Sequence, residues 1–187
     1  MKKLMMIAAL MLATLGANAQ EMFIKPMVGG TLSTFTGDVE GYKMKVGLVA
    51  GAEFGYNISE QFGISAGLLY TMQGGKVKDA ENENVDYLNI PILANYYIIP
   101  GLAIKAGVQP GFLVSAKYDG VDIKDLYQKF DIAIPIGLSY EFDNFVIDAR
   151  YNLGVGNIID KDLSKWAGDA KVHNSVIMLT LGYKIPF

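Results

Sequence analysis

The sequence predicts an all-β fold, namely an eight-stranded antiparallel up-and-down transmembrane β-barrel with a polar lumen, short periplasmic turns and long extracellular loops. Three observations lead to this fold class. Apolar residues alternate with polar or small ones along most of the chain, which is the period of a strand with two different faces. Past the N-terminus, no apolar run reaches the length of about 20 residues that a membrane helix needs. Tight turns also alternate with long polar connections, which is the rhythm of membrane barrels.

The N-terminal segment, residues 1–19, is predicted to be a cleaved signal peptide. Lys2 and Lys3 precede a short apolar run from Leu4 to Leu15, and the small residues Ala17–Asn18–Ala19 form a cleavage site before Gln20. No Cys follows the run, so a lipid-anchored protein is not expected. Residues 20–187 are then long enough for one domain, the barrel itself.

The composition excludes several functional classes. After cleavage, 14 basic residues face 19 acidic ones and the net charge is -5, which gives no reason to expect nucleic-acid binding. The chain contains no Cys, so disulfides and thiolate metal sites are absent. No phosphate-binding loop of the GxxxxGK type occurs. We therefore expect no cofactor.

Eight alternating segments define the expected strands. They are Met22–Leu32, Met44–Asn57, Gln61–Gln73, Val85–Ile98, Leu102–Ala116, Lys129–Phe142, Phe145–Ile158 and about Asn174–Phe187. The long connections between them are Ser33–Lys43, Gly74–Asn84, Lys117–Gln128 and Asn157–His173.

The short turns test this assignment, because an even turn must pair odd with even positions if one face is to stay apolar. A two-residue turn at Asp143–Asn144 predicts the pairs Phe142 with Phe145, Tyr140 with Ile147 and Ile136 with Tyr151. The three-residue turns Ile58–Glu60 and Ile99–Gly101 preserve parity, as the apolar residues on both sides require.

The apolar face is expected to point outward, into lipid. Its side chains are too many and too bulky for the interior of an eight-stranded barrel, which is just wide enough to be filled by side chains. A soluble barrel with an apolar interior is the alternative. The opposite face would line the lumen with a network of charged residues that pair across it: Lys25, Lys45, Glu53, Lys105, Asp131, Glu141, Asp148 and Arg150.

Aromatic residues are expected to form two interfacial girdles. The girdle near the turns would contain Tyr56, Phe62, Tyr140, Phe142, Phe145, Tyr183 and Phe187, and the girdle near the loops Tyr70, Phe112 and Phe130.

The last strand carries a spacing that looks like the sorting signal of bacterial outer-membrane barrels. A polar residue is followed by a glycine two positions on and by apolar residues five and seven positions on, here Thr180, Gly182, Ile185 and Phe187. The sequence therefore predicts integral outer-membrane localisation, contact with outer-membrane lipid, and recognition of the C-terminal strand by the barrel-assembly machinery.

Three motifs resemble the PorT-like family of small outer-membrane β-barrel proteins. They are Tyr87–Pro91 (YLNIP), Phe130–Gly137 (FDIAIPIG) and Arg150–Gly154 (RYNLG). The resemblance extends over nearly the whole mature chain and implies a barrel fold and an outer-membrane location. The family's namesake is associated with type IX protein secretion, so the resemblance also implies a role accessory to secretion or envelope maintenance.

Catalytic and metal-binding chemistry have only weak signals. The single His, His173, lies near Ser175 and Asp169, the residue types of a nucleophilic hydrolase, but a loop histidine is more often solvated. Asp79, Glu81 and Glu83 have the alternate spacing of a calcium loop, yet Asn84 and Ile90 stand where such a loop needs Gly and a carboxylate. We expect no catalytic residues and no metal site.

The long loops are the best candidates for a surface that binds a protein partner. Tyr127 and Trp166 are the candidate contacts, each among other apolar residues. The alternative is that these loops fold over the barrel mouth and bury their own apolar residues. A structural or interaction role is the first hypothesis for function. A passive small-solute porin is the second, and a lipid-modifying enzyme the third.

Overall fold

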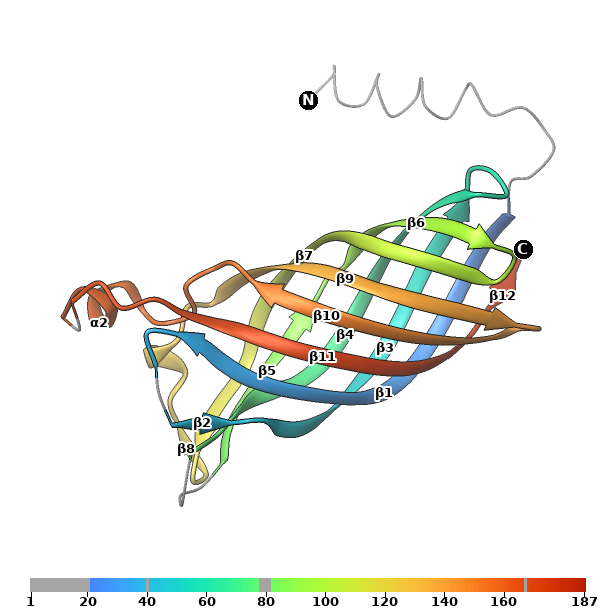
Figure 1. Cartoon of the computed structure of the whole chain (residues 1–187). Coiled ribbons are helices and arrows are strands. Elements are labelled where there is room, and N and C mark those ends of the chain that lie inside the picture. The colour runs from blue at the N-terminus through green and yellow to red at the C-terminus, as the bar shows by residue number, and fades with distance from the viewer. Residues whose placement is uncertain (1–20, 40, 78–81, 167) are drawn as a thin grey trace.

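Eight long antiparallel wall segments form a closed ring (Figure 1). The computed structural model describes residues 21–39, 41–77, 82–166 and 168–187; the expected signal peptide lies outside them. Within these residues the elements are β1 (Glu21–Gly37), β2 (Tyr42–Lys43), β3 (Lys45–Asn57), β4 (Phe62–Val77), β5 (Asn82–Asn89), β6 (Ile92–Ile99), β7 (Leu102–Tyr118), β8 (Val121–Asp122), η1 (Lys124–Leu126), β9 (Phe130–Phe142), β10 (Phe145–Gly154), α2 (Lys161–Trp166), β11 (Val172–Tyr183) and β12 (Ile185–Pro186).

Pairing of the first and last strands closes the barrel. β1 pairs with β11 from Met27↔Gly182 to Gly37↔Val172, and it pairs with β12 through Phe23↔Pro186 and Ile24↔Ile185. Every other wall strand pairs with its neighbours in the chain, β5 and β6 together making one wall segment between β4 and β7. No helix among the described residues is long and apolar enough to cross a membrane.

The register expected at the two-residue turn is confirmed. β9 and β10 pair through Phe142↔Phe145, Tyr140↔Ile147 and Ile136↔Tyr151. At the turn between β3 and β4 the parity is as expected, but Asn57 pairs with Gly63, so this turn is longer than the expected Ile58–Glu60. Parity is also kept on both sides of the Pro100–Gly101 turn, because a register shift between Tyr97 and Ile99 absorbs one residue there. The wall therefore has one continuous outward face.

The strands extend further at the loop end than the hydropathy pattern predicted. β1 continues to Gly37 and β4 to Val77, and β5 begins at Asn82, so the second long connection is reduced to residues 78–81. Backbone pairing continues there, and the inner face stays buried, with Phe35 and Val85 inside the barrel mouth, while the outer face becomes polar. Of the long loops, only those between β7 and β9 and between β10 and β11 remain.

The fourth expected strand is divided in two at Ile90–Pro91. Proline has no N–H to donate to a neighbouring strand, but the wall stays closed around it. The Ile90 N–H donates to the Pro110 carbonyl at 2.8 Å, and the Pro91 carbonyl accepts from the Gly67 N–H at 2.9 Å.

Apolar side chains cover the outside of the wall, as predicted. On β10, burial alternates at every residue, from exposed Phe145 to buried Val146 and onward to Gly154. The exposed bulky residues include Val46 at 75% and Leu48 at 61%. A soluble barrel with an apolar interior is excluded by this arrangement, because the apolar face is the outer one.

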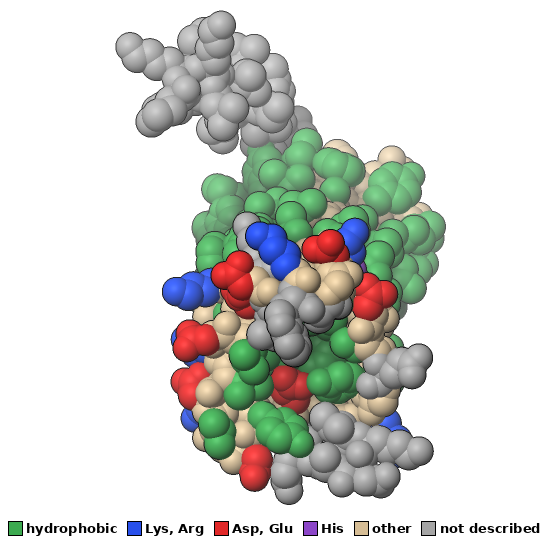
Figure 2. Space-filling view, turned by 90° about the vertical axis from the view of Figure 1, so that its left-hand side faces the viewer, with side chains coloured by type: hydrophobic (Ala, Val, Ile, Leu, Met, Phe, Trp, Pro, Cys, Tyr) green, Lys and Arg blue, Asp and Glu red, His purple; other side chains and the backbone are tan. Residues whose placement is uncertain are grey.

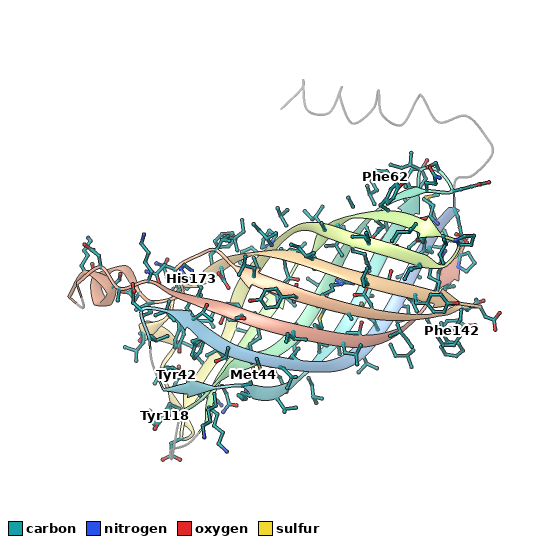
Figure 3. All side chains as sticks on the ribbon, viewed as in Figure 1. Tyr42, Met44, Phe62, Tyr118, Phe142 and His173 are labelled. Carbon is teal, nitrogen blue, oxygen red and sulfur yellow. The ribbon has the colours of Figure 1, made fainter. Side chains whose placement is uncertain are left out.

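Aromatic rings gather at both ends of the wall, as predicted. At the turn end, Phe142 stacks on Phe145 with ring centroids 5.7 Å apart, and Tyr183 meets Phe145 edge-on at 5.2 Å. At the loop end, Phe112 and Phe130 meet at 5.6 Å. Figure 3 shows Phe62 and Phe142 at the turn end and Met44 toward the other. The two ends delimit the band of the wall that faces lipid.

Candidate functional site: a lumen closed at several levels

A cluster of five ionised side chains fills the middle of the lumen. Its members come from four wall strands and are 4% exposed or less: Lys25, Glu53, Lys105, Asp148 and Arg150. We call them the central ion cluster. They include three cations and two carboxylates, so each carboxylate is shared.

The two carboxylates hold the cluster together. Glu53 lies 2.9 Å from Lys25 Nζ, 2.5 Å from Arg150 Nη2 and 3.6 Å from Lys105 Nζ. Asp148 lies 2.6 Å from Lys105 Nζ and 2.6 Å from Arg150 Nε. Arg150 Nη1 finds no hydrogen-bond partner among the described residues. The contacts tie β1, β3, β7 and β10 together across the lumen.

Strand geometry brings these side chains together. Lys25 and Glu53 are directly paired residues of β1 and β3, and Asp148 and Arg150 are two apart on β10, so they share its inner face. Glycines leave room for the side-chain stems. A Cβ on Gly67 would lie 2.7 Å from Glu53 Cγ, one on Gly137 2.9 Å from Arg150 Cγ, and one on Gly182 2.8 Å from Lys25 Cγ.

The other three charges of the predicted network lie outside the central ion cluster. Lys45 donates to the Gln73 carbonyl at 2.8 Å. Asp131 accepts from Asn174 Nδ2 at 2.8 Å and from the Ile132 N–H at 2.7 Å. Both lie closer to the loop end, and Glu141 lies at the turn end. Five of the eight predicted charges are thus paired within the central ion cluster, Glu141 pairs with Lys184 at another depth, and Lys45 and Asp131 are held by neutral partners.

A second charged group, which sequence reasoning missed, closes the turn end. Lys184 Nζ lies 2.8 Å from Glu21 and 3.1 Å from Glu141, and 4.7 Å above the Phe23 ring. Glu141 also accepts from the Tyr97 hydroxyl at 2.9 Å. The even position of Lys184 on the last strand, among lumen-facing residues, is the signal that could have identified it.

Between the polar layers, the lumen contains apolar side chains. Met27, Val49, Leu69 and Met178 form one buried cluster. The lumen is thus polar over most of its length, as expected, with Thr71, Gln73 and Asn89 bonded to one another toward the loop end, and this apolar cluster is the exception. These residues stand at inward positions where a sequence reading looks for polar side chains, and only the layering of the folded barrel shows that they pack on each other.

The loop end is closed by a larger apolar cluster that the loops complete. Its buried members are Phe35, Val85, Tyr87, Ala116, Ile158 and Val172, and Ile123, Tyr127 and Ile159 pack against it. The two long loops are joined by the Tyr127↔Ile159 bridge and by a hydrogen bond from the Gln128 N–H to the Ile158 carbonyl at 2.7 Å. The alternative in which the loops fold over the mouth is thus the observed one for these residues.

Glu83 fastens this closure. Its carboxylate accepts from the Tyr42 hydroxyl at 2.9 Å and from the Tyr127 hydroxyl. Burial, with the Glu83 charge close by, raises the pKa of Tyr42 to about 12, and burial with the Glu83 hydrogen bond also raises the pKa of Tyr127. Both hydroxyls therefore stay protonated and continue to donate. Tyr127, expected to contact a partner, instead points inward. The side chain of Trp166, the other expected contact, is not among the described ones.

Little space remains between the layers. A small cavity lies near the turn end, between the central ion cluster and Glu141. The volume in which the centre of a water molecule can be placed there is about 10 Å³. That volume is about what one water needs.

The residues suspected of catalysis do not contact one another. His173 Nδ1 is 2.8 Å from the Gly156 carbonyl, and Ser175 Oγ is 2.9 Å from the Tyr151 hydroxyl. Of the three suspected metal ligands, Asp79 and Glu81 lie outside the described residues, and Glu83 is bound by two tyrosines. No group of three potential His, Asp or Glu ligands occurs in the described part of the chain.

The four residues of the expected sorting signal divide between the two faces of the wall. Thr180 and Gly182 face the lumen, where Thr180 is 2% exposed and Gly182 contacts Lys25. Ile185 and Phe187 face outward, and Phe187 is 69% exposed. The Phe187 N–H donates to the Met22 carbonyl at 3.0 Å, which joins the end of the chain to its first strand.

A closed ring of eight tilted strands with an apolar exterior defines an integral membrane β-barrel of the bacterial outer membrane. The family described as "Outer membrane protein beta-barrel domain" matches residues 14–160, and the chain belongs to this family. The match ends before β11 and β12, which the structure shows to be needed for closure. A comparison with curated proteins finds no match.

Two solved structures show the same fold. Ail, the attachment invasion locus protein of Yersinia pestis, has a TM-score of 0.55 at 20% identity, with 90% of this chain and 100% of that chain covered. Neisserial surface protein A has a TM-score of 0.55 at 15% identity, with the same coverage. At these identities the likeness concerns the fold alone.

The central ion cluster predicts a large effect of Glu53→Gln. The substitution leaves three buried cations with one carboxylate, and breaking a buried ion pair costs roughly 3 to 5 kcal/mol. We expect a fall of that size in the free energy of unfolding, measured by urea titration of the refolded barrel in lipid. Glu60→Gln, in the exposed turn between β3 and β4, is the control and should change little. Equal stabilities of the two variants would show that the ion pairs are fully solvated.

Gly182→Ala is expected to destabilise the folded barrel, because the new methyl group meets the Lys25 stem. Overpacking of this kind costs about 1 to 3 kcal/mol. Gly30→Ala is the matched control, since its Cβ would have 3.8 Å to its nearest neighbour on the exposed face. Refolding in lipid without assembly proteins separates packing from recognition of the sorting signal. If Gly182→Ala and Gly30→Ala unfold alike, Gly182 has no packing role.

Proposed function

We propose that this barrel is a structural or interaction component of the outer membrane and does not conduct solutes. The central ion cluster carries the proposal, because five buried side chains joined across the lumen occupy the path that a solute would take. The turn-end layer around Lys184 and the apolar cluster at the loop end support it. Eight-stranded barrels are just wide enough for such side chains to fill.

The interaction would take place at the loop end, where a rigid surface faces outward. The bridge between the two long loops and the bonds to Glu83 hold this end in place, so a partner would meet an ordered surface. Val121 and Leu126 are 65% and 44% exposed there. We therefore propose Val121 and Leu126 as the contacts in place of Tyr127, because the side chain of Tyr127 points inward and helps to close the lumen.

The PorT-like motifs extend the proposal to a role accessory to secretion or envelope maintenance. All three motifs include residues of the lumen: Asn89 donates to Thr71 Oγ1 at 2.6 Å, Asp131 accepts from Asn174 Nδ2 at 2.8 Å, and Arg150 belongs to the central ion cluster. They support a common scaffold. The proposal also includes recognition of the C-terminal strand by the barrel-assembly machinery and the absence of enzymatic activity, the latter supported by the separate bonding of His173 and Ser175.

Recordings in planar bilayers test the closed lumen. We expect no discrete openings from the purified protein at neutral pH, because opening would require separation of the central ion cluster. A large-pore porin in the same bilayer is the positive control. Discrete openings whose size changes in Lys105→Ala would show conduction through the lumen, and the passive porin would then be the better description.

Cross-linking from the loops tests the interaction role. A photoreactive residue at Val121 should give a reproducible protein adduct in native outer membranes, whereas the same residue at Glu60, in a turn at the opposite end, should not. Mass spectrometry of the adduct identifies the partner. Absence of any Val121-specific adduct, with the barrel purifying as a lone monomer, would contradict the role proposed for the loop end.

A further inference from the structure

Exposed positive charge is confined to one end of the barrel. Within the described residues, the lysines with exposed side chains all lie at the loop end: Lys43, Lys76, Lys117, Lys129, Lys165 and Lys171. At the turn end the exposed charged residues in the described part are Glu60 and Asp143. Figure 2, which looks at the loop end, shows charged side chains gathered there in front of the apolar wall. Exposed carboxylates lie at the same end, namely Asp119, Asp122, Asp125, Asp162 and Asp169, so any excess of positive charge there is local.

Two of these lysines are direct neighbours on adjacent strands. Lys43 of β2 pairs with Lys76 of β4, and like charges placed directly opposite each other destabilise a sheet. The described residues include no acidic ion-pair partner for either lysine within 4.0 Å. An anion between them would remove the repulsion.

Both side chains point away from the lumen, toward the surrounding membrane surface. Their chain neighbours Tyr42 and Gly75 face inward, as the Tyr42–Glu83 hydrogen bond and the position of Gly75 against the Phe35 and Tyr42 rings show. Successive residues of a strand point to opposite faces, so Lys43 and Lys76 face outward. Lys117 joins them on the same face of β7, because it pairs with Asn84, the residue after inward-facing Glu83. On its other side Lys117 pairs with Asp122 of β8, so its charge is partly offset, and Lys43 and Lys76 carry most of the positive charge of this face.

The height of the lysines matches the headgroup region. Lys43 is adjacent to Met44, which is 57% exposed, and Lys76 lies four residues beyond Met72, which is 37% exposed. A tilted strand with about 3.3 Å per residue thus carries the charges roughly 3 to 13 Å past the last apolar residues. The headgroup layer is about 5 to 8 Å thick on each side of the bilayer, so the lysine backbones lie within this layer or just beyond it, and their flexible side chains can reach into it. Figure 3 shows Tyr42 and Met44 together on this side of the wall.

We propose that Lys43, Lys76 and Lys117 form a binding site for a phosphorylated lipid headgroup of the outer leaflet. Ammonium groups on flexible stems bind phosphate as point charges, and the acyl chains of the same lipid would lie along Met44, Val46 and Leu48, whose side chains are exposed at 57%, 75% and 61%. A lipid is the favoured source of the phosphate because charge and apolar surface are continuous on one face of the wall.

Fluorescent lipid A, added to the detergent-solubilised barrel at 0.15 M salt, tests the proposal by anisotropy. The wild type should bind phosphorylated lipid A, and Lys43→Gln/Lys76→Gln should bind about thirtyfold more weakly, as two basic residues near an anionic surface predict. Lys129→Gln/Lys165→Gln removes the same charge elsewhere on the loop end and should retain wild-type affinity. All of these lysines are exposed, so the variants are expected to fold.

Two further ligands distinguish the source of the phosphate. Dephosphorylated lipid A, with the same acyl chains, should bind as weakly as phosphorylated lipid A binds to the Lys43/Lys76 double variant. Inorganic phosphate at millimolar concentration should not displace phosphorylated lipid A. Equal binding of both lipid A forms, equal loss in the two double variants, or displacement by inorganic phosphate would each overturn the proposed lipid site.

Discussion

The shared carboxylates of Glu53 and Asp148 are the contacts on which the lumen depends. Burial of five ionised groups is unfavourable unless each finds opposite charge at close range, and here the cations of three other strand positions converge on two acceptors. A barrel wall is held together by backbone pairing around its circumference. The central ion cluster adds contacts across the diameter, from β10 to β3 and β7, that backbone pairing cannot supply.

This constraint explains the small residues around the cluster. A lumen only wide enough for side chains cannot hold a long side chain on every strand. Glycines therefore lie at the positions against which the aliphatic parts of Lys25, Glu53 and Arg150 pack. Gly182 is one of them, and it also belongs to the spacing that resembles a sorting signal. One residue can therefore satisfy two requirements, a packing requirement in the lumen and a pattern on the last strand.

Closure at several depths separates the two ends of the molecule. The turn end is polar and contains Lys184 with its two carboxylates, whereas the loop end is apolar inside and is fastened by tyrosines on Glu83. The lumen residues therefore contact one another. The features left for interaction are on the outside, on the exposed loop residues and on the lysines beyond the lipid-facing band.

The sequence by itself determined the strand number, the register at the turn between β9 and β10, and the outward direction of the apolar face. These follow from local rules: a strand has period two, and the pairs Phe142↔Phe145 and Ile136↔Tyr151 are set by a two-residue turn. The sequence also identified all five members of the central ion cluster as lumen residues, because parity alone shows which face they share.

Only the tertiary structure decided which lumen residues meet. Lys45, Asp131 and Glu141 have the same parity as the cluster but lie at other depths, which depend on the stagger of all the strands around the ring. For the same reason, the sequence did not predict the ion pairs of Lys184 or the apolar layer that contains Met27 and Met178. The inward orientation of the Tyr127 side chain could not be predicted either, because it depends on Glu83 and Tyr42, which belong to strands far away in the chain.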